Sequence, residues 1–210
     1  MAQEKHWLRK TWDFIWYDDS WASWLVNIVL AYVIIKFIIY PGLGWILVTP
    51  YPVVAVVSDS MEHKGLEFDT WWQEKQLWYL GRSITYDDFK QYPFKNGFNK
   101  GDIMVLYGTK AADVKKGEVI VFQSGLPYPI IHRVVDIHQD KGPFEGQLFY
   151  ETKGDYNQDQ IKGDLFHPLD ETYVPQRVLY GEAVFRIPYL GYVKIWFVEL
   201  LQMIGLYKIS

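Results

Sequence analysis

The feature that most constrains this chain is an almost entirely apolar run at residues 21–40, in which Asn27 and Lys36 are the strongly polar residues. As a helix, a run of about 20 residues is about 30 Å long, which matches the hydrocarbon thickness of a bilayer. Pro41 follows the run and breaks helical hydrogen bonding. We therefore expect a transmembrane helix at 21–42, with a helix buried in a soluble core as the alternative.

The residues around this run predict its orientation. The run is too long for a cleaved signal peptide and no small-x-small cleavage site follows it, so we interpret it as an uncleaved signal-anchor. Lys5, Arg9 and Lys10 precede it, and positive charges favour the cytoplasmic side. We expect a single-pass protein of the cell membrane, with segment 1–20 cytoplasmic or interfacial and the main domain outside. For segment 1–20, a helix packed on a partner or a disordered lead is the alternative.

Composition limits the rest of the chain. The mean hydropathy is -0.10, which is too low for a polytopic membrane protein. The formal net charge is -4 and no basic cluster is present, which argues against a nucleic-acid partner. The chain has no cysteine, which excludes disulfides and thiolate metal sites. We expect neither a metal nor another cofactor.

Residues 43–190 have the pattern of a small, mainly β domain. Short apolar runs separated by glycine-containing turns are typical of a small sandwich or a coiled barrel. The expected strands are 53–57, 103–107, 119–122, 130–137, 147–152 and 180–186.

Two segments outside this pattern predict helices. In residues 65–100, Thr70 and the Thr85–Asp88 pair are typical helix caps, so we expect a helical insertion there. A surface insertion is the default interpretation, and a lid or membrane flap is the alternative. The segment 191–210 predicts an amphipathic helix on the membrane or against the first span, with a second span as the alternative.

Two serines follow the apolar run at 53–57. Ser58 and Ser60 are two positions apart, so both hydroxyls point to the same side of an extended chain. Serine at a strand end is usually a cap or turn residue, but it becomes a nucleophile when a base lies nearby. Because an extended chain covers at most about 3.5 Å per residue, the short connection to the predicted span keeps Ser60 close to the bilayer.

Two histidines are candidate bases for this serine. His63 needs a tight turn to reach back, whereas His132 lies in an apolar strand, where a histidine is often a satisfied core residue. A neutral imidazole can accept a serine proton, and a third group has to orient it. Asp155, in a Gly-Asp-x-Asn turn, is the best-placed acid by motif, although a plain Asx turn is the alternative. Asp159 and Asp164 are competing acids.

Five short motifs, in this order, resemble those of type I signal peptidases. They are Ser-Asp-Ser-Met-Glu at 58–62, Gly-Asp-Ile-Met-Val at 101–105, Lys-Gly-Glu-Val-Ile-Val-Phe at 116–122, Ile-His-Arg-Val at 131–134 and Thr-Lys-Gly-Asp-Tyr-Asn at 152–157. The resemblance covers most of residues 53–192 apart from the insertion. The bacterial branch has a lysine base in the fourth motif. The histidine in this chain therefore resembles the archaeal and endoplasmic-reticulum branch.

The resemblance implies a signal-peptidase-like coiled β domain and a role for each matched residue. Ser60 corresponds to the nucleophile and His132 to the base. Ser58 corresponds to a serine whose hydroxyl helps the Ser60 amide bind the oxyanion. Asp155 corresponds to the Gly-Asp acid.

Three residues depart from the family pattern. Asp59 stands where relatives have glycine, and His63 stands where they have proline. Many relatives have a second acid six residues after the Gly-Asp acid, and here that position is Ile161. The identity of the third catalytic residue is therefore open, with Asp159 as a substitute or Asp155 acting alone.

These observations predict a membrane-bound serine endopeptidase that removes signal peptides from exported preproteins. The substrate would lie extended along residues 53–57, in contact with Val56. Signal peptides and the lipid bilayer are the expected partners, and the protein-export translocon is a further candidate. The alternatives are a non-catalytic, membrane-anchored β module that binds exported chains, and a self-cleaving Ser/Lys membrane protease with Lys64 or Lys153 as its base.

Overall fold

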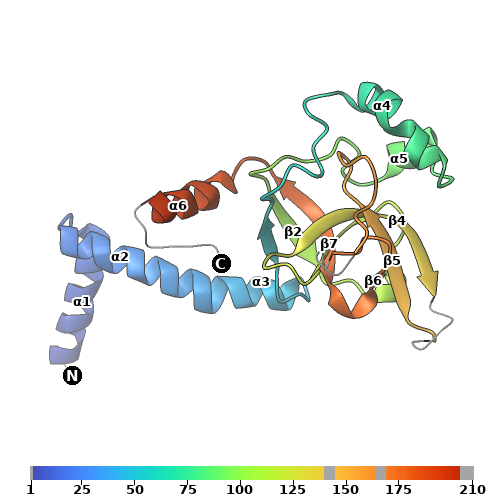
Figure 1. Ribbon diagram of the computed structural model, residues 1–210. Helices are drawn as coiled ribbons and strands as arrows, with labels where there is room; N and C mark the ends of the chain where they lie inside the picture. Colours follow the sequence, from blue (N-terminus) through green and yellow to red (C-terminus); the bar gives the residue numbers. More distant parts are fainter. Residues whose placement is uncertain (1, 140–144, 164–168, 204–210) are drawn as a thin grey trace. The chain divides into compact units, whose positions relative to one another are not determined.

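The computed structural model describes residues 2–139, 145–163 and 169–203, and Figure 1 shows its helices and strands. The chain forms two compact units, Met1–Ile46 and Leu47–Ser210. The first contains helices, and the second contains the sheet, the helical insertion and the last helix.

The first unit begins with a pair of helices, α1 (Ala2–Tyr17) and α2 (Trp21–Ile34). The Ser20 side chain caps α2 by accepting a hydrogen bond from the amide of Ser23. The side-chain amide of Asn27 donates to the carbonyl of Ile15 at 2.8 Å. The polar residue in the apolar run thus satisfies a carbonyl that the end of α1 leaves without an intrahelical partner.

The apolar helix continues past the proline at which we expected it to end. Together α2, the π-helical turn Ile35–Ile39 and α3 (Tyr40–Ile46) form one helix, Trp21–Ile46, of 26 residues with a mean hydropathy of 2.2. In the π turn the Tyr40 amide donates to the Ile35 carbonyl, five residues back. This change of hydrogen-bond register directly precedes Pro41, which has no amide hydrogen to donate.

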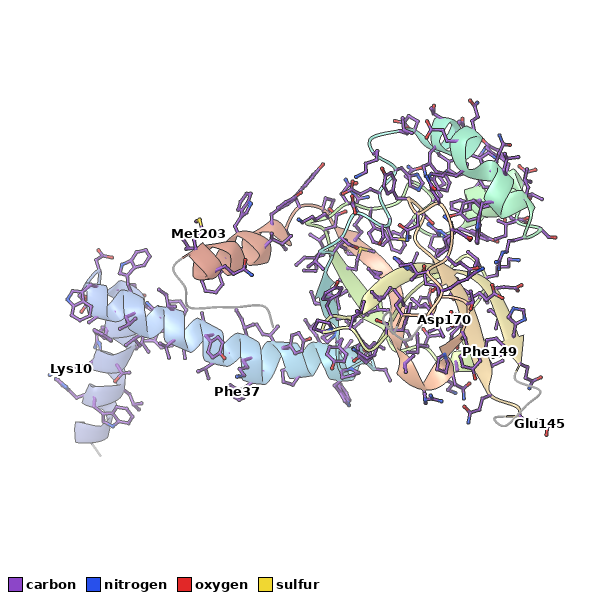
Figure 2. All side chains as sticks on the ribbon, in the orientation of Figure 1. Lys10, Phe37, Glu145, Phe149, Asp170 and Met203 are labelled. Atoms are coloured by element: carbon purple, nitrogen blue, oxygen red, sulfur yellow. The ribbon has the colours of Figure 1, made fainter. Side chains whose placement is uncertain are left out.

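Among the described residues, this is the helix whose length and composition suit a membrane span. Its side chains are almost all exposed, and Phe37, labelled in Figure 2, is 63% exposed.

The second unit is built on a curled antiparallel sheet, which confirms the predicted mainly β fold. The strand order is β1-β2-β7-β3-β4-β5-β6. The strands are β1 (Val53–Ala55), β2 (Ile103–Tyr107), β3 (Val119–Phe122), β4 (Ile130–Gln139), β5 (Leu148–Lys153), β6 (Val174–Pro175) and β7 (Leu179–Ile187). Two short 3-10 turns, Ala111–Asp113 and Gln176–Val178, connect them. Six of the strands follow the sequence prediction closely, whereas β6 was not predicted because two residues carry no periodicity.

The insertion is a packed helical subdomain. It contains α4 (Phe68–Leu80) and α5 (Tyr86–Gln91), which lie together in Figure 1. Their aromatic side chains form a buried cluster with Val135 of β4, so the insertion shares its core with the sheet. The predicted capping box of Thr85 and Asp88 is present. The predicted Thr70 cap is wrong, because α4 begins earlier and Glu67 is its N-cap.

The last helix, α6 (Tyr192–Met203), carries an exposed apolar surface. Its exposed large side chains are Val193, Trp196, Phe197, Leu200 and Met203. Met203 is labelled in Figure 2 and is 81% exposed. This surface has the composition of an interfacial helix.

Candidate active site

The structure brings Ser60 and His132 together. Ser60 follows β1, and His132 lies on β4, paired across the sheet with Ile120 of β3. The Nε2 atom of His132 is 2.8 Å from the Oγ atom of Ser60. His132 is buried, at 4% exposure, whereas the serine hydroxyl is partly accessible. A hydroxyl in hydrogen-bond contact with an imidazole has the geometry of a nucleophile and its general base.

A second hydroxyl also lies within hydrogen-bond distance of the Ser60 oxygen. The Oγ atoms of Ser58 and Ser60 are 3.1 Å apart. If the Ser60 hydroxyl donates to His132, the Ser58 hydroxyl can donate to Ser60. A hydroxyl next to a nucleophile is a candidate donor to an oxyanion.

The turn after β5 holds this pair in place. The amide of Tyr156 donates to the carbonyl of Ser60 at 2.9 Å. A Cβ atom on Gly154 would lie 2.7 Å from the Ser60 carbonyl oxygen and 3.0 Å from Nε2 of His132. The glycine of the Gly-Asp motif is therefore required by the close approach of three segments.

The acid next to His132 is Glu171, which no motif in the sequence predicted. Its Oε1 atom is 2.5 Å from Nδ1 of His132, and its side chain is 0% exposed. The Ile161 amide donates to the other carboxylate oxygen at 2.8 Å, and the Glu171 amide donates to the Ile161 carbonyl at 2.8 Å. The carboxylate is thus fixed against the residue at which the family pattern predicts an acid.

Asp155, predicted as the orienting acid, has different partners. Its carboxylate accepts hydrogen bonds from Arg133 and from the Tyr79 hydroxyl, and it lies 3.4 Å from Nε2 of His63. Burial alone would raise the pKa of Asp155, but the charge of Arg133 and the hydrogen bonds of His63 and Arg133 lower it well below the ordinary value. None of the described hydrogen bonds joins Asp155 to His132, because neighbouring residues of a strand face opposite sides and Asp155 lies on the Arg133 side.

Asp159, one of the two competing acids, has partners other than His132. Asp159 accepts a hydrogen bond from the Trp78 indole at 2.8 Å, and this bond is the main reason why its pKa is lowered. Asp164 lies outside the described residues.

His63, the second candidate base, contacts the helical insertion instead of Ser60. Its ring stacks on Trp71, with centroids 3.8 Å apart and an interplanar angle of 5°. Its Nε2 atom faces Asp155 rather than Ser60. This histidine, which directly follows the motif at 58–62, therefore connects that motif to α4.

The two candidate lysines point elsewhere. Lys64 pairs with Asp59 and Glu62, and the hydrogen bonds to these carboxylates raise the pKa of Lys64 above its ordinary value. Lys153 is buried, donates to the Gly154 carbonyl at 3.0 Å, and has its pKa lowered to about 8 by burial. Neither makes a described contact with Ser60.

A small pocket opens beside the Ser60–His132 pair. Its volume is about 40 Å³. It is lined by Ala55, Val57, Ser58, Tyr128, Pro129, Ile130, Ile131 and His132. The pocket therefore lies between the end of β1 and the start of β4.

Val56, predicted to contact substrate, is instead a core residue with 1% exposure. Its amide donates to the Asp102 carbonyl, and its carbonyl accepts from the Gly101 amide. Because backbone groups alternate along a strand, those of Ala55 and Val57 face the outer edge of β1. That edge has no strand partner among the described residues.

Comparison with known proteins gives relatives that are named signal peptidase complex catalytic subunits. Human signal peptidase complex catalytic subunit SEC11C is 29% identical over 99 residues, which are 47% of this chain and 49% of that protein. SEC11 of Colletotrichum graminicola is 27% identical over 176 residues, 83% of this chain and 79% of that protein. SEC11 of Plasmodium falciparum is 32% identical over 104 residues, 49% of this chain and 53% of that protein.

No family model matches the chain. In the human and Plasmodium comparisons, the chain spans about half the length of the curated relative. These relatives confirm the resemblance predicted from the motifs: the chain has homologues that are named SEC11 signal peptidase catalytic subunits.

Proposed function

We propose that the protein is a membrane-bound serine endopeptidase that removes signal peptides from exported preproteins, with Ser60 as nucleophile and His132 as general base. The observation that carries this proposal is the 2.8 Å contact between Ser60 Oγ and His132 Nε2. The names of its SEC11 relatives supply the reaction class and the substrate.

Acylation begins when the Ser60 oxygen attacks the scissile carbonyl carbon and His132 Nε2 takes the hydroxyl proton. The Ser60 amide and the Ser58 hydroxyl donate to the oxyanion of the tetrahedral intermediate. When the peptide C–N bond breaks, His132 returns the proton to the leaving amine, and the signal peptide stays bound to Ser60 as an ester. A water then attacks the ester with His132 again as the base, which releases the carboxylate and restores the hydroxyl.

The outer edge of β1 supports binding of an extended substrate. The backbone groups of Ala55 and Val57 face that edge and can pair with the substrate backbone as an added strand. Such a strand runs toward Ser58 and Ser60, because they follow β1 directly. The substrate carbonyl is thereby brought to the nucleophile.

The pocket beside His132 supports a preference for small side chains. Its volume of about 40 Å³ is small, which fits a small substrate side chain better than a bulky one. Tyr128 and Ile131 form part of its wall. A bulky side chain would require these residues to move.

The helix Trp21–Ile46 supports attachment to a lipid bilayer. Its 26 residues exceed the length needed to cross the hydrocarbon core. With the positive charges before it in the cytoplasm, the sheet would lie on the outer side of the cell membrane. The exposed apolar side chains of α6 fit a helix on the membrane surface, and a second span is the alternative. The export translocon is a candidate partner because it delivers the substrates.

The test uses the full chain in detergent micelles and a preprotein with an intact signal peptide. Cleavage should give one new amino terminus after small residues, and Ser60→Ala should abolish it. Cleavage that persists in Ser60→Ala would contradict the serine mechanism. Binding of the preprotein without cleavage by the unaltered protein would favour a non-catalytic β module.

A further inference from the structure

The buried carboxylate of Glu171 has the position of a residue that orients the base. With the Ser60 hydroxyl donating to Nε2 of His132, the ring proton is on Nδ1 and is donated to Glu171 Oε1 at 2.5 Å. A carboxylate in this position fixes the productive tautomer and stabilises the imidazolium that forms when Ser60 attacks.

Burial and hydrogen bonds hold the Glu171 carboxylate in contact with His132. Its side chain is 0% exposed, and among the described ion pairs its partner is His132. The Ile161 amide and, at 3.4 Å, the Thr152 hydroxyl donate to its two oxygens. The side-chain amide of Gln160 donates to its backbone carbonyl at 3.2 Å. A buried carboxylate costs stability unless it is hydrogen-bonded in this way.

The position of Glu171 also explains the departure at Ile161. The two residues exchange two hydrogen bonds, one of them to the Glu171 carboxylate itself. We propose that Glu171 is the positioning residue of the Ser60–His132 pair, and that its carboxylate replaces the acid that many relatives have at the position of Ile161. This inference rests on the proposed function, since it assigns a role within the same reaction.

The first test is Glu171→Gln in the full chain in micelles, because glutamine keeps the size but cannot hold the negative charge. We expect kcat for preprotein cleavage to fall by about 10²- to 10⁴-fold, with KM changed by less than about threefold. The matched control is Asp136→Asn. Asp136 faces His138 at 3.6 Å on the same strand as His132, but it does so on an exposed surface. This control should change kcat by less than about twofold.

Two further variants separate chemistry from folding. Glu171→Asp restores a shortened carboxylate, and Ile161→Asp combined with Glu171→Gln supplies one from residue 161. Recovery of kcat by at least tenfold over Glu171→Gln in either variant supports the inference. The inference is overturned if Glu171→Gln lowers kcat by less than about tenfold, or if kcat recovers in neither variant.

A readout without substrate separates this inference from the proposed function. The Nδ1 proton of His132 should give a downfield one-proton NMR resonance that disappears in His132→Ala and in Glu171→Gln. If this resonance behaves as expected but the unaltered protein cleaves no preprotein, the function is wrong and the placement of Glu171 stands. If preprotein cleavage requires Ser60 but the resonance persists in Glu171→Gln, the function stands and the placement is wrong.

Discussion

Arg133 and Asp155 form a bidentate ion pair in the interior of the second unit. The Nε and Nη2 atoms of Arg133 lie 2.9 Å and 2.7 Å from the two oxygens of Asp155. The remaining guanidinium donors reach the carbonyls of Pro93, Phe94 and Gly117. This pair joins β4 to the end of the insertion and to the turn that carries Gly154.

We expect Asp155→Asn to lower the free energy of unfolding and not to act directly on the cleavage reaction. Removing one partner of a buried pair leaves Arg133 uncompensated, which costs about 3–5 kcal/mol in the free energy of unfolding. Denaturant unfolding measures this loss. Asp159→Asn, which changes an exposed carboxylate of the same loop and keeps an oxygen that can accept from Trp78, is the control and should lose less than about 1 kcal/mol. Unchanged unfolding of Asp155→Asn together with a large fall in kcat would instead give Asp155 a chemical role.

Lys153 should make stability depend on pH. Its pKa of about 8 in the folded chain lies below its ordinary value of 10.5 because burial disfavours the charge. Between these values the unfolded chain binds more protons, so the free energy of unfolding rises as the pH increases above about 8. The Tm of the unaltered protein should rise relative to that of Lys153→Met between pH 7.5 and about pH 9.5. Parallel Tm curves would contradict the assignment.

The same variant tests the Ser/Lys alternative. Because Lys153 donates to the Gly154 carbonyl and makes no described contact with Ser60, Lys153→Met should retain cleavage by its folded fraction. Cleavage lost in Lys153→Met but retained in His132→Ala would identify the lysine as the base.

Gly154→Ala should disable the site by steric contact. The added methyl group would lie 2.7 Å from the Ser60 carbonyl oxygen and 3.0 Å from His132 Nε2. A displacement of about 1 Å between reacting groups costs about 10²-fold in rate, and we expect at least this fall in kcat. The control is Gly42→Ala, where a Cβ atom meets nothing within 4 Å. Full activity of Gly154→Ala would show that the three segments are not held as closely as described.

Ser58→Ala should lower kcat more than it raises KM. Its hydroxyl lies 3.1 Å from Ser60 Oγ and is assigned to the oxyanion, whose charge develops in the transition state. Loss of one such donor costs about 10²- to 10³-fold in kcat. Ser124→Ala, which removes a buried hydroxyl without a described partner, is the control. A rise in KM at constant kcat would show that Ser58 binds substrate and does not stabilise the transition state.

Sequence patterns predicted the strands because strand formation here depends on residues that are close together in the chain. Runs such as Val119–Phe122 combine apolar, β-branched residues with a preceding glycine turn, and the structure has a strand there. The helix end predicted from Pro41 was wrong, because a π turn directly before a proline has no recognised signal in the sequence. The continuation to Ile46 depends on that change of hydrogen-bond register.

The site could be predicted in part. Motifs indicated Ser60 and His132, whose contact the structure contains. Glu171 could not be found in this way, because it lies 39 residues from His132 in a segment without a motif. The missing acid at Ile161 was the signal that a carboxylate had to come from elsewhere. The partner of Asp155 was partly foreseeable, since Arg133 follows His132 and faces the opposite side of β4.

The most direct test of the account is a double-mutant cycle on kcat with Ser60→Ala, His132→Ala and the double variant. When two residues act as one catalytic unit, removing either one already removes most of the rate enhancement. The double variant should therefore be no slower than either single variant. Each should be slower than the unaltered protein by at least about 10³-fold. Losses that multiply in the double variant, or a single variant that keeps a tenth of the activity, would contradict a serine activated by this histidine.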